Sequence, residues 1–177
     1  FLFDTSTIEH TGLASQACPP RKRIDSEYLP QIGWWRPPFI ASFKCRGREL
    51  CLVTAHIRWA GDDEMARLPE IELLADWVHR RSQEDWLRHA DLFVLGDFNI
   101  PSVDSPLFRA IVRRGLVAPK VLLGAHGTNL AMNKRYDQIL HLPGRGFGLT
   151  GLGGELDFYS GGIEGLYGRR ARVDERE

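Results

Sequence analysis

The chain has 177 residues, enough for one domain with a sizeable buried core. Its 23 basic and 23 acidic side chains balance, so net charge does not indicate a nucleic-acid binder, although a protein that holds phosphates through bound cations needs no basic excess. No apolar run approaches the ~18 residues of a membrane span, and the start lacks a signal-peptide pattern. The three cysteines have no paired spacing, which argues against a disulfide framework and structural zinc. We expect reduced, core-facing thiols and a reducing compartment, with the cytoplasm favoured.

The N-terminal part of the chain reads as two strands followed by a loop. Residues 1–4 and 12–18 have the pattern of short strands joined by a turn. The stretch 19–35 is polar and contains prolines, so we expect a long surface loop there.

A β-hairpin and a helix are expected next. Residues 38–44 and 49–59 are apolar, β-rich runs separated by Arg46-Gly47-Arg48, a natural hairpin turn. Residues 66–80 then follow a helical period, with Pro69 tolerated in the first turn. The apolar positions that recur at this period are Leu68, Ile71, Leu74 (or Ala75) and Val78.

Residues 91–95 form a compact apolar run of the kind typical of a fully buried strand. Asp104 or Ser105 can cap a short helix that has Pro106 at its first position and is stopped by Gly115. Residues 136–142 indicate another strand. Beyond Pro143 the chain becomes glycine-rich and then highly charged, with little sign of a packed element apart from 156–159. We expect one domain over 1–160 and a charged tail over 161–177.

The segment Leu95-Gly96-Asp97-Phe98-Asn99 carries the strongest chemical signal. In a strand-like segment, residues two apart point to the same side, so Asp97 and Asn99 can face one ligand together. An aspartate can activate an attacking water or bind a hard cation, and an asparagine can hold a phosphoryl oxygen. A strand end closed by an Asx turn explains the same letters.

Two further residues lie at the expected strand ends. His56, near the end of the 49–59 run, can hydrogen-bond a phosphate or protonate a leaving oxygen, but a lone histidine is more often structural. Asp137 sits at the mouth of the 136–142 strand, where a buried carboxylate needs a partner such as a cation or an ordinary salt bridge.

Taken together, these segments resemble the endonuclease/exonuclease/phosphatase superfamily, and within it the deoxyribonuclease I-like enzymes. That family has a strand with a histidine, a helix, a strand ending in Gly-Asp-x-Asn, and a strand beginning Tyr-Asp or Ile-Asp. His56, Asp97 with Asn99, and Tyr136-Asp137 follow this order over residues 37–142. The resemblance implies a layered α/β sandwich with two mainly antiparallel β-sheets flanked by helices.

The resemblance also implies roles for these residues. Asp97 would position or activate water, and Asn99 would bind the phosphate. His56 would hydrogen-bond or protonate around that phosphate, and Asp137 would support the centre. Magnesium or manganese, held by Asp97 and Asn99, would neutralise charge in the transition state. The substrate-binding positions that the resemblance adds are Arg36, Thr128, Asn129 and Tyr136.

The chain departs from the family pattern at both ends. The family's early glutamate has no counterpart, and no Asp-His pair follows Asp137. We therefore expect an incomplete copy of the domain that is weakly active or inactive alone. The hydrolase interpretation favours nucleic acid as substrate. A phosphatase acting on phosphoinositides or small phosphorylated compounds, and a non-catalytic binding domain, remain alternatives; oligomeric state is not indicated.

Two other sequence patterns are weaker evidence for a function. Residues 146–151 match GxGxxG, but the dinucleotide-binding motif must open a helix, which the following glycines discourage. Trp34, Trp35 and Trp59 can stack on bases, although packing in the core or in loops explains them as well.

Overall fold

The computed structural model describes residues 1–155, except 31–32, 62, 125–126, 130 and 145–147. The element expected at 156–159, the boundary near 160 and the charged tail lie outside the described residues. The GxGxxG segment at 146–151 is described only in part.

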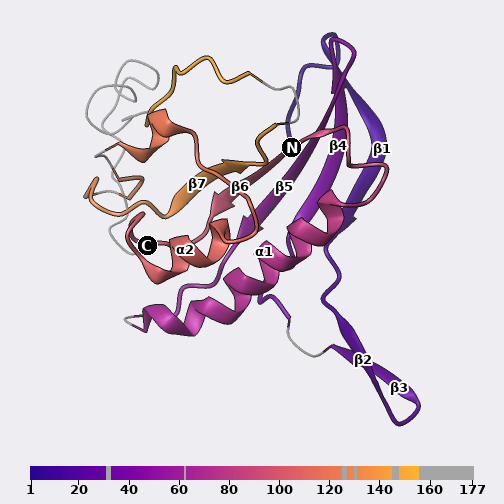
Figure 1. Cartoon of the computed structure of the whole chain (residues 1–177), viewed down its shortest axis with the longest axis vertical. Helices are drawn as coiled ribbons and strands as arrows, with labels where there is room; N and C mark the ends of the chain where they lie inside the picture. Colours follow the sequence, from indigo (N-terminus) through magenta and orange to yellow (C-terminus); the bar gives the residue numbers. More distant parts are fainter. Residues whose placement is uncertain (31–32, 62, 125–126, 130, 145–147, 156–177) are drawn as a thin grey trace, which may run out of the picture.

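A five-stranded mixed sheet forms the centre of the molecule (Figure 1). Its order is β1-β4-β5-β6-β7, and every neighbouring pair is antiparallel except β5 and β6. The parallel pair needs a crossover, which the helix between β5 and β6 provides. The strands span Ile8–Gln16 (β1), Phe39–Cys45 (β4), Arg48–His56 (β5), Asp91–Asp97 (β6) and Asp137–His141 (β7).

Helices α1 (Leu68–Ser82) and α2 (Pro106–Val112) lie together on one face of the sheet (Figure 1). The expected helix at 66–80 is confirmed, and the short 3₁₀ helix η1 (Glu64–Arg67) leads into it. Ser105, rather than Asp104, caps α2, because its hydroxyl accepts the Leu107 N–H at 3.0 Å. A second 3₁₀ turn, η2, spans Lys120–Leu123.

The hydrophobic core lies between the sheet and these helices. Alternate residues of β5 and β6 are fully buried there, against one stripe of α1 and the inner side of α2. The helical period read from the sequence is therefore the one that packs. Representative core residues are Val53, Val94, Leu140, Ile71, Leu74, Val78, Leu107 and Ile111.

The α/β class with two mainly antiparallel sheets is confirmed, and the second sheet is small. It consists of β2 (Arg21–Ile24) and β3 (Glu27–Pro30), which pair as an antiparallel hairpin. Figure 1 shows this hairpin projecting away from the rest of the molecule. Within the described residues, the layers are thus one sheet and one helical cover.

The N-terminal expectations need correction. Residues 1–4 form no strand; instead, the rings of Phe1 and Phe3 pack edge-on against Phe43, with ring centres 5.6 and 5.1 Å away. The stretch 19–35 contains the β2–β3 hairpin rather than only a loop. Its side chains are exposed along β2, so no apolar alternation marks it in the sequence.

The three cysteines are free thiols, but only Cys51 is buried, and Cys18 is exposed. The expectation of core-facing thiols therefore holds for Cys51 alone. Burial raises the pKa of Cys51 to about 12, so this thiol is unreactive at neutral pH. No helix in the described part of the chain has the length and apolar character needed to cross a membrane.

Candidate active site

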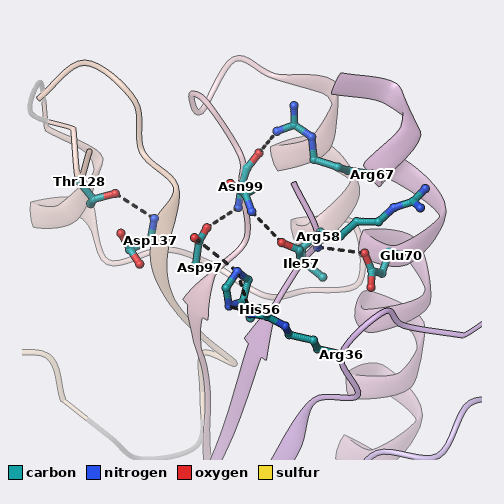
Figure 2. Close-up of polar contacts among 10 residues, drawn as sticks. All are labelled: Arg36, His56, Ile57, Arg58, Arg67, Glu70, Asp97, Asn99, Thr128 and Asp137. Atoms are coloured by element: carbon teal, nitrogen blue, oxygen red, sulfur yellow. Dashed lines mark hydrogen bonds and ion pairs between the residues drawn. The ribbon is translucent and has the colours of Figure 1, made fainter. Parts of the chain in front are cut away.

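Three predicted site residues occupy paired positions at the ends of three adjacent strands. His56 on β5 pairs with Asp97 on β6, and Asp97 pairs with Asp137 on β7. Directly paired residues present their side chains on the same face of a sheet, so the three form one row. Figure 2 shows these side chains next to one another.

The row opens on the sheet face that the helices leave uncovered. On β7, exposed Asp137 and Ile139 alternate with buried Gln138 and Leu140. His56 is exposed, while its neighbour Ala55 is buried in the core. A ligand can therefore reach the row from solvent.

Asp97 is the central and least hydrated member of the row. Its Oδ1 accepts the Asn99 N–H at 2.8 Å, and its Oδ2 lies 3.9 Å from Nε2 of His56. Burial raises the pKa of Asp97, and the negative charge of Asp137 raises it further, against the opposing effects of the Asn99 hydrogen bond and of His56. A carboxylate whose pKa is raised in this way is a better proton acceptor than an ordinary aspartate.

Arg36 determines which nitrogen of the neutral His56 ring carries the proton. Its guanidinium lies 2.7 Å from Nδ1 of His56. A guanidinium has only donors, so Nδ1 must accept this hydrogen bond. In the neutral ring, the proton is then on Nε2, the nitrogen nearer Asp97. Arg36, predicted from the sequence to lie near the substrate, thus contacts the row directly.

Asn99 is held from three sides in an unusual backbone conformation. Its φ of 51° is in the left-handed region, which asparagine tolerates better than most residues. The side-chain amide of Asn99 donates to the Ile57 carbonyl at 2.7 Å, and the guanidinium of Arg67 donates to the backbone carbonyl of Asn99. The strand-like spacing predicted for Asp97 and Asn99 is wrong, because β6 ends at Asp97; the Asx-type hydrogen bond joins them instead.

Gly96 permits the close contact between β5 and β6 just before the site. A Cβ at this position would lie 2.1 Å from the Ala55 carbonyl oxygen, and its φ of 137° is open to glycine alone. The glycine before Asp97 is therefore required by the packing of the two strands that carry His56 and Asp97.

Asp137 enters the row without the burial expected of it. The carboxylate is exposed, so water solvates it, and the argument from a buried charge does not apply. Its N–H donates to the Thr128 hydroxyl at 3.0 Å, so Thr128 fixes the start of β7. Asn129 instead closes its own loop, because its Oδ1 accepts the N–H groups of Asn133 and Lys134 at 3.0 and 2.8 Å.

A cavity of about 380 Å³ lies beside Asp137 on β7. Thr128 and Asn129 form part of its wall, and the backbone of Gly96 reaches it as well. His56 and Asn99 do not line this cavity, so it adjoins the row rather than containing it. The substrate-binding roles predicted for Thr128 and Asn129 remain predictions.

Glu70 and Arg67 organise the site, although the sequence did not single them out. The buried Glu70 carboxylate, in the first turn of α1, accepts the N–H groups of Trp35 and Arg58 at 2.6 and 3.2 Å. It thereby joins the segment that carries Arg36 to the segment that follows His56. Figure 2 shows the second of these contacts, between Glu70 and Arg58. An acidic residue in a first helical turn is too common to reveal such a contact in advance.

The donor atoms in the row suit a hard divalent cation. Asp97 and Asp137 bring carboxylate oxygens to paired positions. Burial is the main cause of the raised pKa of Asp97, and a cation between the two carboxylates would relieve the repulsion by Asp137 that adds to it. Magnesium is commonly held by one or two carboxylates together with waters and substrate phosphates. Within the described residues, no three His, Cys, Asp or Glu side chains gather closely enough to form a metal site by themselves.

The fold is shared with known enzymes of one class. No protein-family profile matches the sequence, and no curated protein does. Among solved structures, humanized D. rerio TDP2 matches with a TM-score of 0.55 and 16% identity, over 81% of this chain and 55% of that one. An endonuclease/exonuclease/phosphatase from Bacteroides vulgatus matches with a TM-score of 0.53 and 16% identity, over 80% and 57%.

The mannosyl-6-phosphatase Bt3783 of Bacteroides thetaiotaomicron matches similarly, with a TM-score of 0.52 and 18% identity, over 80% of this chain and 55% of that one. The chain thus has the endonuclease/exonuclease/phosphatase fold that its motifs predict. It spans a little over half the length of these structures.

Proposed function

We propose that this chain carries the catalytic row of a metal-dependent phosphodiesterase that cleaves phosphodiester bonds with activated water. The observation that supports it is the pairing of His56, Asp97 and Asp137 across three adjacent strands, with Asn99 directly after Asp97. A histidine and two carboxylates on one open edge, with the buried carboxamide of Asn99 next to them, provide a proton acceptor, a hydrogen-bond donor and phosphate contacts.

In this proposal Asp97 orients the attacking water and accepts its proton through the carboxylate whose pKa is raised by burial. His56 donates a hydrogen bond from Nε2 to a phosphate oxygen, because Arg36 occupies Nδ1. Asn99 uses one amide hydrogen on Ile57 and keeps a second for the phosphate.

Magnesium or manganese, when bound by Asp97, Asn99 and Asp137, would neutralise the charge that develops on the phosphoryl oxygens. The residues of this chain do the rest: they fix the water, hold the phosphate and keep the histidine tautomer. Asp137 adds negative charge next to Asp97, which favours a cation there.

We propose nucleic acid as the substrate, which makes the protein endonuclease-like. A phosphatase acting on phosphoinositides or small phosphorylated compounds is the second candidate, and the similar fold of a mannosyl-6-phosphatase favours it. In either case, the bond cleaved is a phosphoester.

The test replaces Asp97 and His56 singly with alanine in the full-length protein and measures magnesium-dependent hydrolysis of an oligonucleotide. Each variant should lose ~100-fold or more in turnover, the usual effect of removing a general acid or base. Asp85→Ala and His89→Ala are matched controls, since both residues are exposed and precede β6 at the opposite end of the sheet.

Turnover close to wild type in both Asp97→Ala and His56→Ala would rule out the proposal. Oligonucleotide binding without any hydrolysis, unchanged by added metal, would instead favour a non-catalytic binding domain.

A further inference from the structure

An aromatic pair, made of exposed Trp59 and half-buried Tyr136, spans the end of β6 next to the catalytic row. The rings of Trp59 and Tyr136 meet edge to face, with their centres 5.5 Å apart. Trp59 follows β5 and Tyr136 directly precedes β7, while β6 lies between these two strands. The contact must therefore cross the turn in which Asp97 leads to Asn99.

Arg67 ties this pair to the backbone of the site. Its guanidinium lies 4.8 Å from the centre of the Trp59 ring, and the same group donates to the Asn99 carbonyl. Arg67 is only 3% exposed, so its position is fixed by packing. The Trp59 ring is thus held in place relative to Asn99 rather than left free to move.

Core packing accounts for little of the Trp59 ring. This side chain is 56% exposed, whereas Trp34 and Trp77 are 7% and 4% exposed and pack against each other inside the molecule. A large, rigid aromatic surface that faces solvent, beside the residue proposed to hold the phosphate, has the form of a stacking platform.

We propose that the Trp59–Tyr136 pair stacks on a nucleobase adjacent to the scissile phosphate. This inference rests on the proposed function and narrows its substrate to nucleic acid with an unpaired base. Every base has a π-face, so the platform should bind bases with little sequence preference. In this proposal the Asn99 carboxamide contacts the phosphate, and the rings of Trp59 and Tyr136 contact the base attached to that nucleotide.

The test measures binding without metal, so that cleavage does not interfere. A single-stranded oligonucleotide of about eight nucleotides is compared with an abasic oligonucleotide of the same length, both labelled with radioactive phosphate to avoid an aromatic dye. Wild type should bind the base-bearing strand about 10-fold more tightly, as expected for stacking on one or two bases.

Trp59→Leu should remove this preference and bind both strands alike, while Trp59→Phe should keep most of it. Trp86→Leu is the matched control, because Trp86 is 48% exposed but lies before β6, at the opposite end of the sheet. Thermal unfolding of each variant checks that the fold is intact.

The inference is overturned if wild type binds the two strands equally or binds neither. It is also overturned if Trp59→Leu keeps the wild-type preference, or if Trp59→Leu and Trp59→Phe weaken both strands to the same extent. Failure of the proposed function would appear separately, as a full-length wild-type protein that hydrolyses no phosphoester with magnesium.

Discussion

In its proposed role as a proton acceptor Asp97 must be ionised, yet its surroundings disfavour the negative charge. Burial raises its pKa above the ordinary value of 3.8, and Asp137 adds to the effect. A carboxyl of this kind binds more protons when folded than when unfolded, so its contribution to stability is present below pH 3.8 and is lost as pH rises through the raised pKa.

We therefore predict that Asp97→Asn unfolds at a higher temperature than wild type at pH 7 in EDTA, by about 1–3 °C. The difference should vanish near pH 3, where the carboxyl is protonated in both states. Thermal unfolding across this pH range provides the measurement, with Asp85→Asn as the control. A variant that is less stable at pH 7, or a difference independent of pH, would contradict the electrostatic explanation.

Asn99 combines a backbone role with a side-chain role, and two substitutions can separate them. The Asn99→Ala substitution removes the side-chain hydrogen bond to the Ile57 carbonyl, and the left-handed conformation then costs about 1–2 kcal/mol. The Asn99→Gly substitution removes the same hydrogen bond, but glycine adopts the left-handed conformation without a steric cost.

We predict that Asn99→Gly is more stable than Asn99→Ala by about 1 kcal/mol in urea unfolding, whereas both lose hydrolysis to a similar extent. Equal stability would show that the positive φ carries no cost. Retained hydrolysis in Asn99→Gly would show that the carboxamide does not hold the phosphate.

At the scale of elements, α1 positions the site as well as covering the sheet. Its first turn places Glu70 between the segment before β4 and the segment after β5. Both segments lack regular structure, so this buried carboxylate takes the place of strand pairing in holding them.

Glu70→Ala should therefore destabilise the fold by about 2 kcal/mol, since it leaves the N–H groups of Trp35 and Arg58, which are bonded to the buried Glu70 carboxylate, without a charged acceptor. Glu72→Ala is the matched control on the same helix. Its exposed ion pair with Arg113 should contribute less than about 1 kcal/mol.

Chemical unfolding gives both values, and the NMR signals of the His56 ring report whether the site shifts. Equal losses in the two variants, or an unchanged His56 environment in Glu70→Ala, would contradict a positioning role.

These elements also show which parts of the structure the sequence reveals. The apolar runs locate β5, β6 and β7 to within a few residues. His56 and Asp97 at the ends of their strands, and Asp137 at the start of β7, then lie on one edge of the sheet. The helix α1 is equally visible, because its period matches its buried side.

The sequence does not reveal features that depend on distant contacts or on exposed backbone. Glu70 bonds a residue 35 positions away in the chain, and nothing in its local context indicates that partner. The β2–β3 hairpin is exposed along β2 and lacks apolar alternation, so it reads as a loop. The positive φ of Asn99 also breaks the two-residue periodicity on which its orientation was predicted.

At the scale of the whole molecule, the helices cover one face of the sheet and the row opens on the other. Ile139 is 45% exposed on this open face, next to Asp137 in the alternation of β7. The matched part of this chain covers only 55% of the solved structures of similar fold, so a metal site built from these residues is best tested directly on the chain itself.

Selective broadening of histidine NMR signals by manganese tests, without requiring turnover, whether His56, Asp97 and Asp137 share one cation site. Small additions of Mn²⁺ should broaden the ring signals of His56 before those of His10, His79 and His89, and a double variant, Asp97→Ala with Asp137→Ala, should abolish the difference. Broadening that spares His56, or that persists in the double variant, would contradict the claim that these side chains share one cation site.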